Sequence, residues 1–284
     1  MRRFLKRLVG SSPGLSQFVF LKGALRGHFY SPVPSLEEVR LHRKQIFDVV
    51  PREIPGVRLR EQEQLELIER FAREYYPEQP FPTAFFENSQ FRYSDAITLY
   101  CMLRYSRPRR LIEVGSGYSS QVTLETNRRF LGNSVECVFI EPFPSDALKA
   151  AAGSLVIQKR IQDVPLETFS QLDAGDILFI DSTHVSKVGS DVNHIFFHIL
   201  PVLRAGVRVH FHDVFYPFEY PERWIMEGKV WNEDYLLRAF LQFNNDFEIE
   251  LFPNYLMRFH QEFFREKMPL CLKDPGGSIW LLRK

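Results

Sequence analysis

The sequence predicts an α/β protein built on a doubly wound, mostly parallel sheet. From residue 94 onward, short apolar runs alternate with segments of helical length, a pattern typical of parallel strands joined by helical crossovers. The turn Gly115-Ser116-Gly117 follows the first apolar run, and acidic residues follow several later ones. Two more apolar runs come late in the sequence, with no helical crossover of the usual kind between them. We therefore expect seven strands, the last two forming an antiparallel hairpin.

Each element has a predicted place along the chain. The strands are expected at residues 111–114, 137–141, 154–158, 176–181, 206–213, 247–252 and 278–283. The helices are expected at residues 95–104, from the glycine turn to about residue 130, and at 145–152, 166–172 and 191–203. Because crossover helices pack against a parallel sheet, we expect helices on both of its faces.

The first 90 residues lack this alternation. Prolines break them into short pieces, and two helices are predicted, one capped by Ser35 over residues 35–47 and one that begins at Glu61. The next stretch, residues 75–91, is rich in proline and aromatic side chains and is expected to be a loop or lid. We therefore predict a helical N-terminal segment or lid (residues 1–90) followed by a ligand-binding domain (residues 91–284).

The composition is that of an ordinary soluble globular protein. The 284 residues are 45% hydrophobic and 25% charged, with a net charge of +1. Nucleic acid is not expected as a partner, since binding it requires many phosphates to be neutralised. Three cysteines, Cys101, Cys137 and Cys271, have no paired spacing, which favours a reducing compartment over a disulfide framework. A cytoplasmic protein is predicted, and a homo-oligomer is left open.

The basic N-terminus, MRRFLKRL, raises the question of export or membrane contact. Its apolar runs are short and interrupted by serine, proline and glycine, so it lacks the hydrophobic core of a signal peptide. No run in the sequence reaches the length of a transmembrane segment. A short basic helix that touches a membrane surface remains an alternative for this stretch.

Acidic residues stand near the carboxyl ends of three predicted strands. Glu113 precedes the glycine turn, Glu141 ends the second strand, and Asp163 follows the third. Open parallel sheets bind ligands at this edge, where a carboxylate can accept hydrogen bonds from both hydroxyls of a ribose. Each acid alone is also explained as a solvated loop charge. Together the three acids predict a site for a nucleotide-like ligand.

The segments EVGSGYS, IEP, IQDV, FIDSTH and GVRVHFHDV occur in this order, and residues 91–284 resemble the class I S-adenosylmethionine-dependent methyltransferases. The resemblance implies a Rossmann-like sheet with S-adenosylmethionine as its cofactor. It also implies that Glu141 binds the ribose and that Asp163 faces the adenine. The methionine part of the cofactor is then expected to lie against Glu113, Gly115 and Gly117. The further residues expected to bind the cofactor are Ser116, Tyr118, Ser119 and Asp181.

Two histidines and two aspartates follow the fourth and fifth predicted strands. Asp181 ends the fourth strand, with His184 three residues later, and His212 and Asp213 end the fifth. This layout is similar to the metal-dependent O-methyltransferases of the catechol and macrolide-sugar types. The resemblance implies that Asp181, His212 and Asp213 hold a divalent metal and that His184 is the general base.

Histidine at position 212 departs from the family pattern, in which an oxygen ligand is usual. Magnesium prefers oxygen ligands, whereas imidazole suits a softer ion such as manganese. Both ions are kept as candidates, and a metal-free pair of His212 and Asp213 is the alternative.

The sequence therefore predicts a small-molecule O-methyltransferase, with a divalent metal as a further candidate cofactor. Aromatic side chains in residues 214–231 are candidates for the wall of the acceptor site. A nicotinamide-dependent oxidoreductase is the first alternative, but Ser120 stands where the third glycine of a dinucleotide fingerprint is expected. A non-catalytic module that binds the cofactor is the second alternative.

Overall fold

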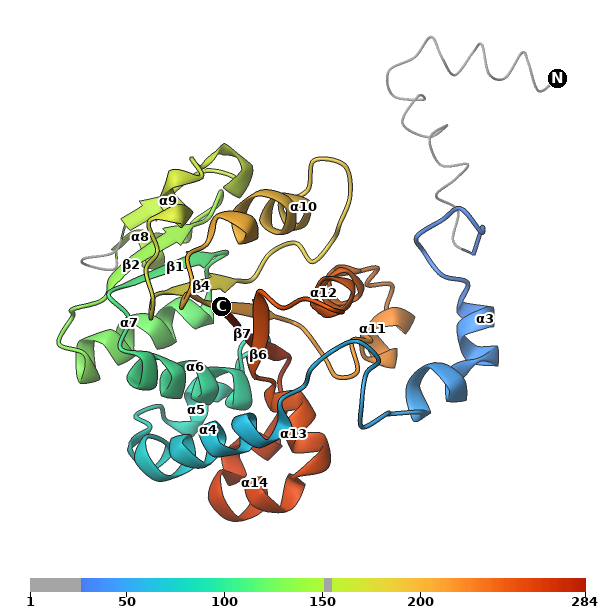
Figure 1. Cartoon of the computed structure of the whole chain (residues 1–284), viewed down its shortest axis with the longest axis horizontal. Helices are drawn as coiled ribbons and strands as arrows, with labels where there is room; N and C mark the ends of the chain where they lie inside the picture. Colours follow the sequence, from blue (N-terminus) through green and yellow to red (C-terminus); the bar gives the residue numbers. More distant parts are fainter. Residues whose placement is uncertain (1–26, 151–154) are drawn as a thin grey trace, which may run out of the picture. The chain divides into compact units, whose positions relative to one another are not determined.

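The computed structural model describes residues 27–150 and 155–284 (Figure 1). The chain divides into two compact units, one of Met1–Val50 with Pro221–Val230 and one of Pro51–Tyr220 with Trp231–Lys284. Residues 51–90 lie in the same unit as the sheet, and the division expected at residue 90 stays a prediction. The basic N-terminal stretch lies outside the described residues.

The larger unit is built around a seven-stranded sheet in the order β3-β2-β1-β4-β5-β7-β6 (Figure 1). The first five strands are parallel to one another, and β7 runs antiparallel to both β5 and β6. Their bounds are β1 Arg110–Val114, β2 Glu136–Ile140, β3 Leu155–Ile157, β4 Ile177–Ile180, β5 Arg208–His212, β6 Phe247–Leu251 and β7 Ser278–Arg283. The predicted fold class is confirmed.

Burial along the strands follows their place in the sheet. Every residue of β4 is buried, because a central parallel strand is covered on both faces. The edge strand β6 instead alternates, with Phe247, Ile249 and Leu251 buried and the two glutamates between them partly exposed. Period-two alternation is the pattern of a strand with one face on the core.

Helices connect the parallel strands. They are α7 (Tyr118–Phe130), α8 (Asp146–Ala150), α9 (Glu167–Ser170) and α10 (Asp191–His194), and α6 (Tyr93–Ser106) precedes β1. The helices α6 and α7 lie side by side (Figure 1), and the first eleven residues of α6 are all buried. The segment expected to be helical over residues 191–203 is helical, but α10 passes into a π-helical turn (Ile195–Ile199) and a 3-10 turn (Leu200–Val202). Pro201 lacks the amide proton that a regular helix would need there.

The predicted helices before the sheet are also present. In α3 (Leu36–Leu41) the Ser35 hydroxyl accepts a hydrogen bond from the Glu38 amide, so the predicted cap is confirmed. The second is α4 (Glu61–Glu74), which contacts β6. The stretch expected to be a loop contains a 3-10 turn (Tyr76–Glu78) and the short helix α5 (Thr83–Phe86).

The second half of the unit contains helices that the sequence pattern did not predict. The two final strands pair antiparallel as expected, but α13 (Pro253–Phe259), α14 (Gln261–Lys267) and a 3-10 turn (Pro269–Lys273) stand between them. The antiparallel pair is therefore confirmed, whereas the helices between its strands were not predicted. The helix α12 (Glu233–Leu241) follows β5 in this unit, and α11 (Glu222–Met226) belongs to the smaller unit. Within residues 27–150 and 155–284, no helix has the length and apolar character needed to cross a bilayer.

Candidate active site

The glycine turn brings the ends of β1 and β4 together. Gly115 has a φ of +83°, and a Cβ atom built on it would lie 2.2 Å from the carbonyl oxygen of Asp181. Both facts require glycine, since other residues rarely adopt this φ and a side chain would collide with the backbone. Gly117 ends the turn, and its amide donates to the Ser120 hydroxyl at the start of α7. The turn at Gly115-Ser116-Gly117 is therefore tight, as its two glycines predict.

Glu113 is a fully buried carboxylate at the end of β1. Its Oε1 accepts hydrogen bonds from the hydroxyls of Ser119 and Ser120, both at 2.7 Å, while Oε2 has no partner among the described residues. Burial raises the pKa of Glu113 to about 8, because it outweighs the two serine hydrogen bonds that act in the opposite direction. A buried oxygen without a partner is costly, which marks Glu113 as a candidate to contact a ligand.

Replacing Glu113 by glutamine is expected to change how stability depends on pH. The carboxyl keeps its proton in the folded state up to about pH 8 but loses it near pH 4.5 when unfolded, so the free energy of unfolding of the wild type falls across this window. Glutamine does not titrate, so the variant should gain stability relative to the wild type as the pH rises from 5 to 8. Denaturant titrations at both pH values measure the gain, and a pH-independent difference would contradict the raised pKa.

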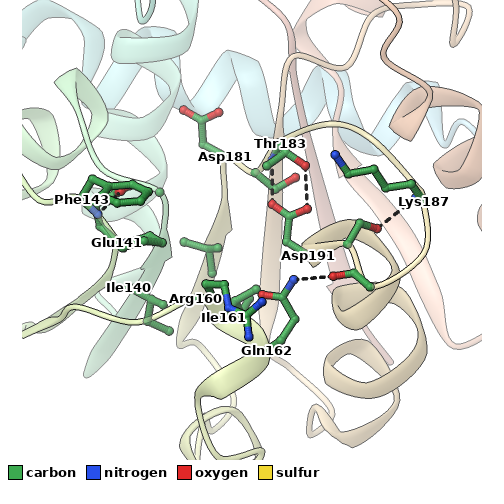
Figure 2. A pocket seen from close by; sticks show the side chains of 16 residues that line it. Ile140, Glu141, Phe143, Arg160, Ile161, Gln162, Asp181, Thr183, Lys187 and Asp191 are labelled. Carbon is green, nitrogen blue, oxygen red and sulfur yellow. Dashed lines mark hydrogen bonds between the residues drawn. The ribbon is translucent and has the colours of Figure 1, made fainter. Parts of the chain in front are cut away.

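A cavity of about 380 Å³ opens at the carboxyl ends of β1, β2 and β4 (Figure 2). Glu141 and Phe143 line one side of it, and Thr183, Lys187 and Asp191 line the other. The Glu141 carboxylate accepts a hydrogen bond from the Phe143 amide at 2.8 Å, which holds the loop after β2. The Thr183 amide and hydroxyl donate to the Asp191 carboxylate at 2.9 and 2.6 Å, as the dashed lines in Figure 2 mark.

The predicted cofactor residues are not all at this cavity. Gly115, Glu141 and Asp181 line it, but Asp163 does not, and the neighbouring Gln162 does. Asp163 faces outward in an ion pair with Arg160 at 2.8 Å, and this hydrogen bond lowers its pKa. Of the rest, Ser119 donates a hydrogen bond to Glu113. Ser116 and Gly117 lie in the turn and Tyr118 begins α7, and none of the three lines the cavity.

Asp181, His212 and Asp213 converge, as predicted for strands that are neighbours in the sheet. One potential ligand atom from each lies within 4.8 Å of the others. The His212 Nδ1 atom is 3.6 Å from Asp181 Oδ1 and 3.8 Å from Asp213 Oδ2. Burial would lower the pKa of His212, but the two carboxylates hold it well above its usual range.

This cluster fits a divalent cation. Both imidazole nitrogens of His212 are buried without a hydrogen-bond partner among the described residues. Two carboxylate oxygens and one imidazole nitrogen are donors that manganese and iron accept readily. Asp181 stays ionised, because His212 and His184 hold its pKa well below the usual range despite its burial.

His184 lies against the same two aspartates. Its Nε2 is 3.3 Å from Asp181 Oδ1 and 3.6 Å from Asp213 Oδ2, while its Nδ1 contacts Glu233 Oε2 at 2.8 Å. Burial would lower the pKa of His184, but the three carboxylates raise it to about 10. The Trp231 ring lies beside the imidazole, with 4.4 Å between the ring centroids. The imidazole is therefore fixed on both nitrogens and on one face.

The backbone at His184 is strained in a way that α12 supports. His184 has a φ of +60°, a conformation that is uncommon outside glycine and asparagine. Its carbonyl oxygen accepts hydrogen bonds from the amides of Asn232 and Glu233, at the start of α12, at 3.0 and 3.2 Å. Such strain persists only where the surroundings hold it, and it gathers at functional sites.

Residues 112–214 match the family model of a methyltransferase domain. The match begins in β1 and ends just after Asp213, so it contains the glycine turn, the cavity-lining Glu141, His184 and His212. The chain belongs to the class I S-adenosylmethionine-dependent methyltransferases. An uncharacterized protein of Archaeoglobus fulgidus is a relative of this methyltransferase, with 34% identity over 160 residues, 52% of this chain and 72% of that protein.

Solved structures similar to this methyltransferase have low sequence identity to it. One is a methyltransferase of Geobacter sulfurreducens, with 14% identity, a TM-score of 0.38 and coverage of 89% of this chain and 100% of that one. Another is an O-methyltransferase of Bacillus cereus in complex with SAH, with 15% identity, a TM-score of 0.35 and coverage of 87% and 97%. The family assignment rests on the sequence matches.

Sequence reasoning missed Glu233 and Asp95, which contact the two histidines of this methyltransferase. Glu233 is 49 residues from His184 and Asp95 is far from His212, so no local spacing connects them. Both stand in the first turn of a helix, where an acid is already explained by the helix dipole. The aromatic loop also differs from expectation, since Tyr216, Phe218 and Tyr220 are buried in the core.

Proposed function

We propose that this methyltransferase transfers the methyl group to a hydroxyl of a small molecule, with a divalent cation held by Asp181, His212 and Asp213. The observation that carries the proposal is the convergence of these three donors with His184 at one edge of the sheet. The methyltransferase family argues against the nicotinamide-dependent oxidoreductase. The catalytic reading is favoured over a module that only binds the cofactor, since two buried histidines facing two aspartates serve proton transfer better than scaffolding.

The cofactor is proposed to lie in the cavity beside β1, β2 and β4. Glu141 would accept hydrogen bonds from the ribose, and Glu113 would face the ammonium of the methionine part. Gly115 lines this cavity, and its missing side chain lets the turn pass close to the carbonyl group of Asp181. Asp163 is kept as a proposal for the adenine, although its carboxylate would first have to leave Arg160.

Replacing Glu141 by alanine should weaken the binding of S-adenosylhomocysteine by about 1.5–3 kcal/mol, the usual contribution of a hydrogen bond to a charged group. Isothermal titration calorimetry measures the loss. Asp146→Ala, which removes a carboxylate in the nearby helix α8, is the control and should bind as the wild type does. Wild-type affinity in the Glu141 variant would contradict the ribose assignment.

The chemistry at the acceptor follows from where His184 is held. An oxygen nucleophile must lose its proton during transfer, and Nε2 is the nitrogen that faces the site because Glu233 occupies Nδ1. When bound, a divalent cation would lower the pKa of an acceptor hydroxyl and offset the negative charge of Asp181 and Asp213. Two of the three carboxylates that raise the pKa of His184, Asp181 and Asp213, are the ones that a cation would engage, whereas Glu233 would stay at Nδ1. Trp231 is the aromatic side chain placed to contact an acceptor beside the imidazole.

A matched pair of acceptors tests the reaction class. The protein would be incubated with methyl-labelled S-adenosylmethionine, Mn²⁺ and aromatic or sugar acceptors that differ only in carrying a hydroxyl or an amine. Label recovered as a methyl ether supports the proposal. Label recovered only as a methylamine contradicts hydroxyl transfer, and cofactor binding without turnover of any acceptor favours the non-catalytic module.

A further inference from the structure

His212 lies between two sets of carboxylates. Its Nδ1 faces Asp181 and Asp213, and its Nε2 lies 3.5 Å from Oδ2 of Asp95. Asp95 is only 4% exposed and stands in the first turn of α6, across the imidazole from the proposed cation site. Phe91 lies against the same imidazole, with 5.1 Å between ring centroids. The imidazole of His212 is therefore confined at both nitrogens.

The segment Gly276-Gly277-Ser278 holds Asp95 in place. The Ser278 hydroxyl donates to Asp95 Oδ1, and the Gly277 amide donates to Oδ2 at 3.4 Å. Ser278 also pairs with His212 in the register of β5 and β7. Among the described residues, Asp95 has no lysine or arginine partner. Its charge is thus directed at His212 and at donors from the start of β7.

Both glycines are needed for this arrangement. Gly276 has a φ of +65°, and a Cβ atom on it would lie 2.3 Å from Asp95 Oδ1. A Cβ atom on Gly277 would lie 2.7 Å from the Phe215 ring and 3.2 Å from the Cα atom of Asp213. The chain therefore passes closely between the carboxylate behind His212 and the backbone of Asp213. This proximity fixes the distance between Asp95 and the proposed cation site.

We propose that Asp95 is a positioning residue that makes His212 a metal ligand through Nδ1. An imidazole can give a lone pair to a metal from one nitrogen only when the other nitrogen carries the proton. A carboxylate beside the protonated nitrogen fixes the tautomer and the ring orientation and makes the ligand more basic. Asp95 Oδ2 lies 3.5 Å from Nε2, within reach of this role although no hydrogen bond joins the two atoms, and Nδ1 is left for the cation between Asp181 and Asp213. This inference rests on the proposed metal site.

Manganese affinity, measured without turnover, tests the inference. Mn²⁺ would be titrated into the full-length protein, with free Mn²⁺ followed by electron paramagnetic resonance. Asp95→Asn and Asp95→Ala should each bind Mn²⁺ about 10–100-fold more weakly than the wild type, the usual effect of removing such a partner. Asp176→Asn is the matched control, because Asp176 is equally buried but accepts backbone hydrogen bonds at the opposite end of β4. It should keep wild-type Mn²⁺ affinity, and thermal unfolding confirms that all variants fold.

A spectroscopic measurement shows whether Asp95 positions the His212 imidazole or only stabilises the surrounding structure. With Zn²⁺ as a diamagnetic ion, the imidazole ¹⁵N shifts of His212 should show a protonated Nε2 and a metal-bound Nδ1, and Asp95→Ala should lose this signature. Wild-type Mn²⁺ affinity in both Asp95 variants would overturn the inference while leaving the metal site intact. Loss of binding as complete as in Asp181→Asn would make Asp95 a direct ligand and also overturn it. Absence of Mn²⁺ binding by the wild type would overturn the metal site itself.

Discussion

Replacing His184 by alanine should lower turnover by about 10²–10⁴-fold while leaving cofactor affinity near that of the wild type. This range is the usual contribution of general acid–base catalysis. The imidazole reaches the site only through Nε2, since Nδ1 contacts Glu233 at 2.8 Å. His184 contacts the proposed cation ligands and does not itself line the cofactor cavity, although its neighbour Asp181 does, so the loss should appear in kcat.

Two further variants make the His184 result specific. His184→Asn keeps a polar side chain that tolerates the φ of +60°, so it separates loss of the base from backbone strain. His198→Ala removes an exposed histidine from the π-helical turn after α10 and should leave turnover unchanged. Normal turnover in both His184 variants would place proton removal elsewhere, with Asp213 as the next candidate.

Removing divalent cations should abolish activity, and manganese should restore it at least as well as magnesium. The reason is that an imidazole ligand favours the softer ion. Asp181→Asn and Asp213→Asn should each weaken the dependence of kcat on added metal. Glu113→Gln should not, because Glu113 lies at the end of β1 and supports the cofactor side of the site.

The metal-free alternative predicts that chelation leaves activity unchanged. If activity survives exhaustive chelation, His212 and Asp213 act as a hydrogen-bonding pair that orients the acceptor. The assignment of His184 would then be judged by its own variants, since Nε2 reaches the acceptor side with or without a cation.

The sequence predicted the parallel half of the sheet well because its signals are local. Buried strands such as β4 are continuous apolar runs, and the residue after each run falls at the ligand edge by topology alone. This logic placed Glu141 and Asp181 at the cavity. It also predicted that Asp181 would lie close to His212 and Asp213. It could not foresee that Asp163 would pair with Arg160 and turn away, because that depends on side-chain conformation in a loop.

What escaped prediction depends on contacts between distant parts of the chain. Glu233 reaches His184 only because α12 begins where the loop after β4 passes, and residues 232–242 carry no motif that identifies them. Asp95 and Ser278 meet because β7 inserts beside β5. The helices between β6 and β7 were missed for another reason, since they are short segments of seven residues each.

The position of β7 has a consequence for synthesis of the chain. It is the last strand to be made, yet it lies between β5 and β6, so the edge of β5 has no partner until residues 278–283 leave the ribosome. At 5–20 residues per second, translation of residues 213–277 takes on the order of 3–13 s. During that time an unpaired strand edge invites association with other chains. We expect nascent chains halted before Ser278 to require chaperones, and the Asp95 contact behind His212 to form only after release of β7.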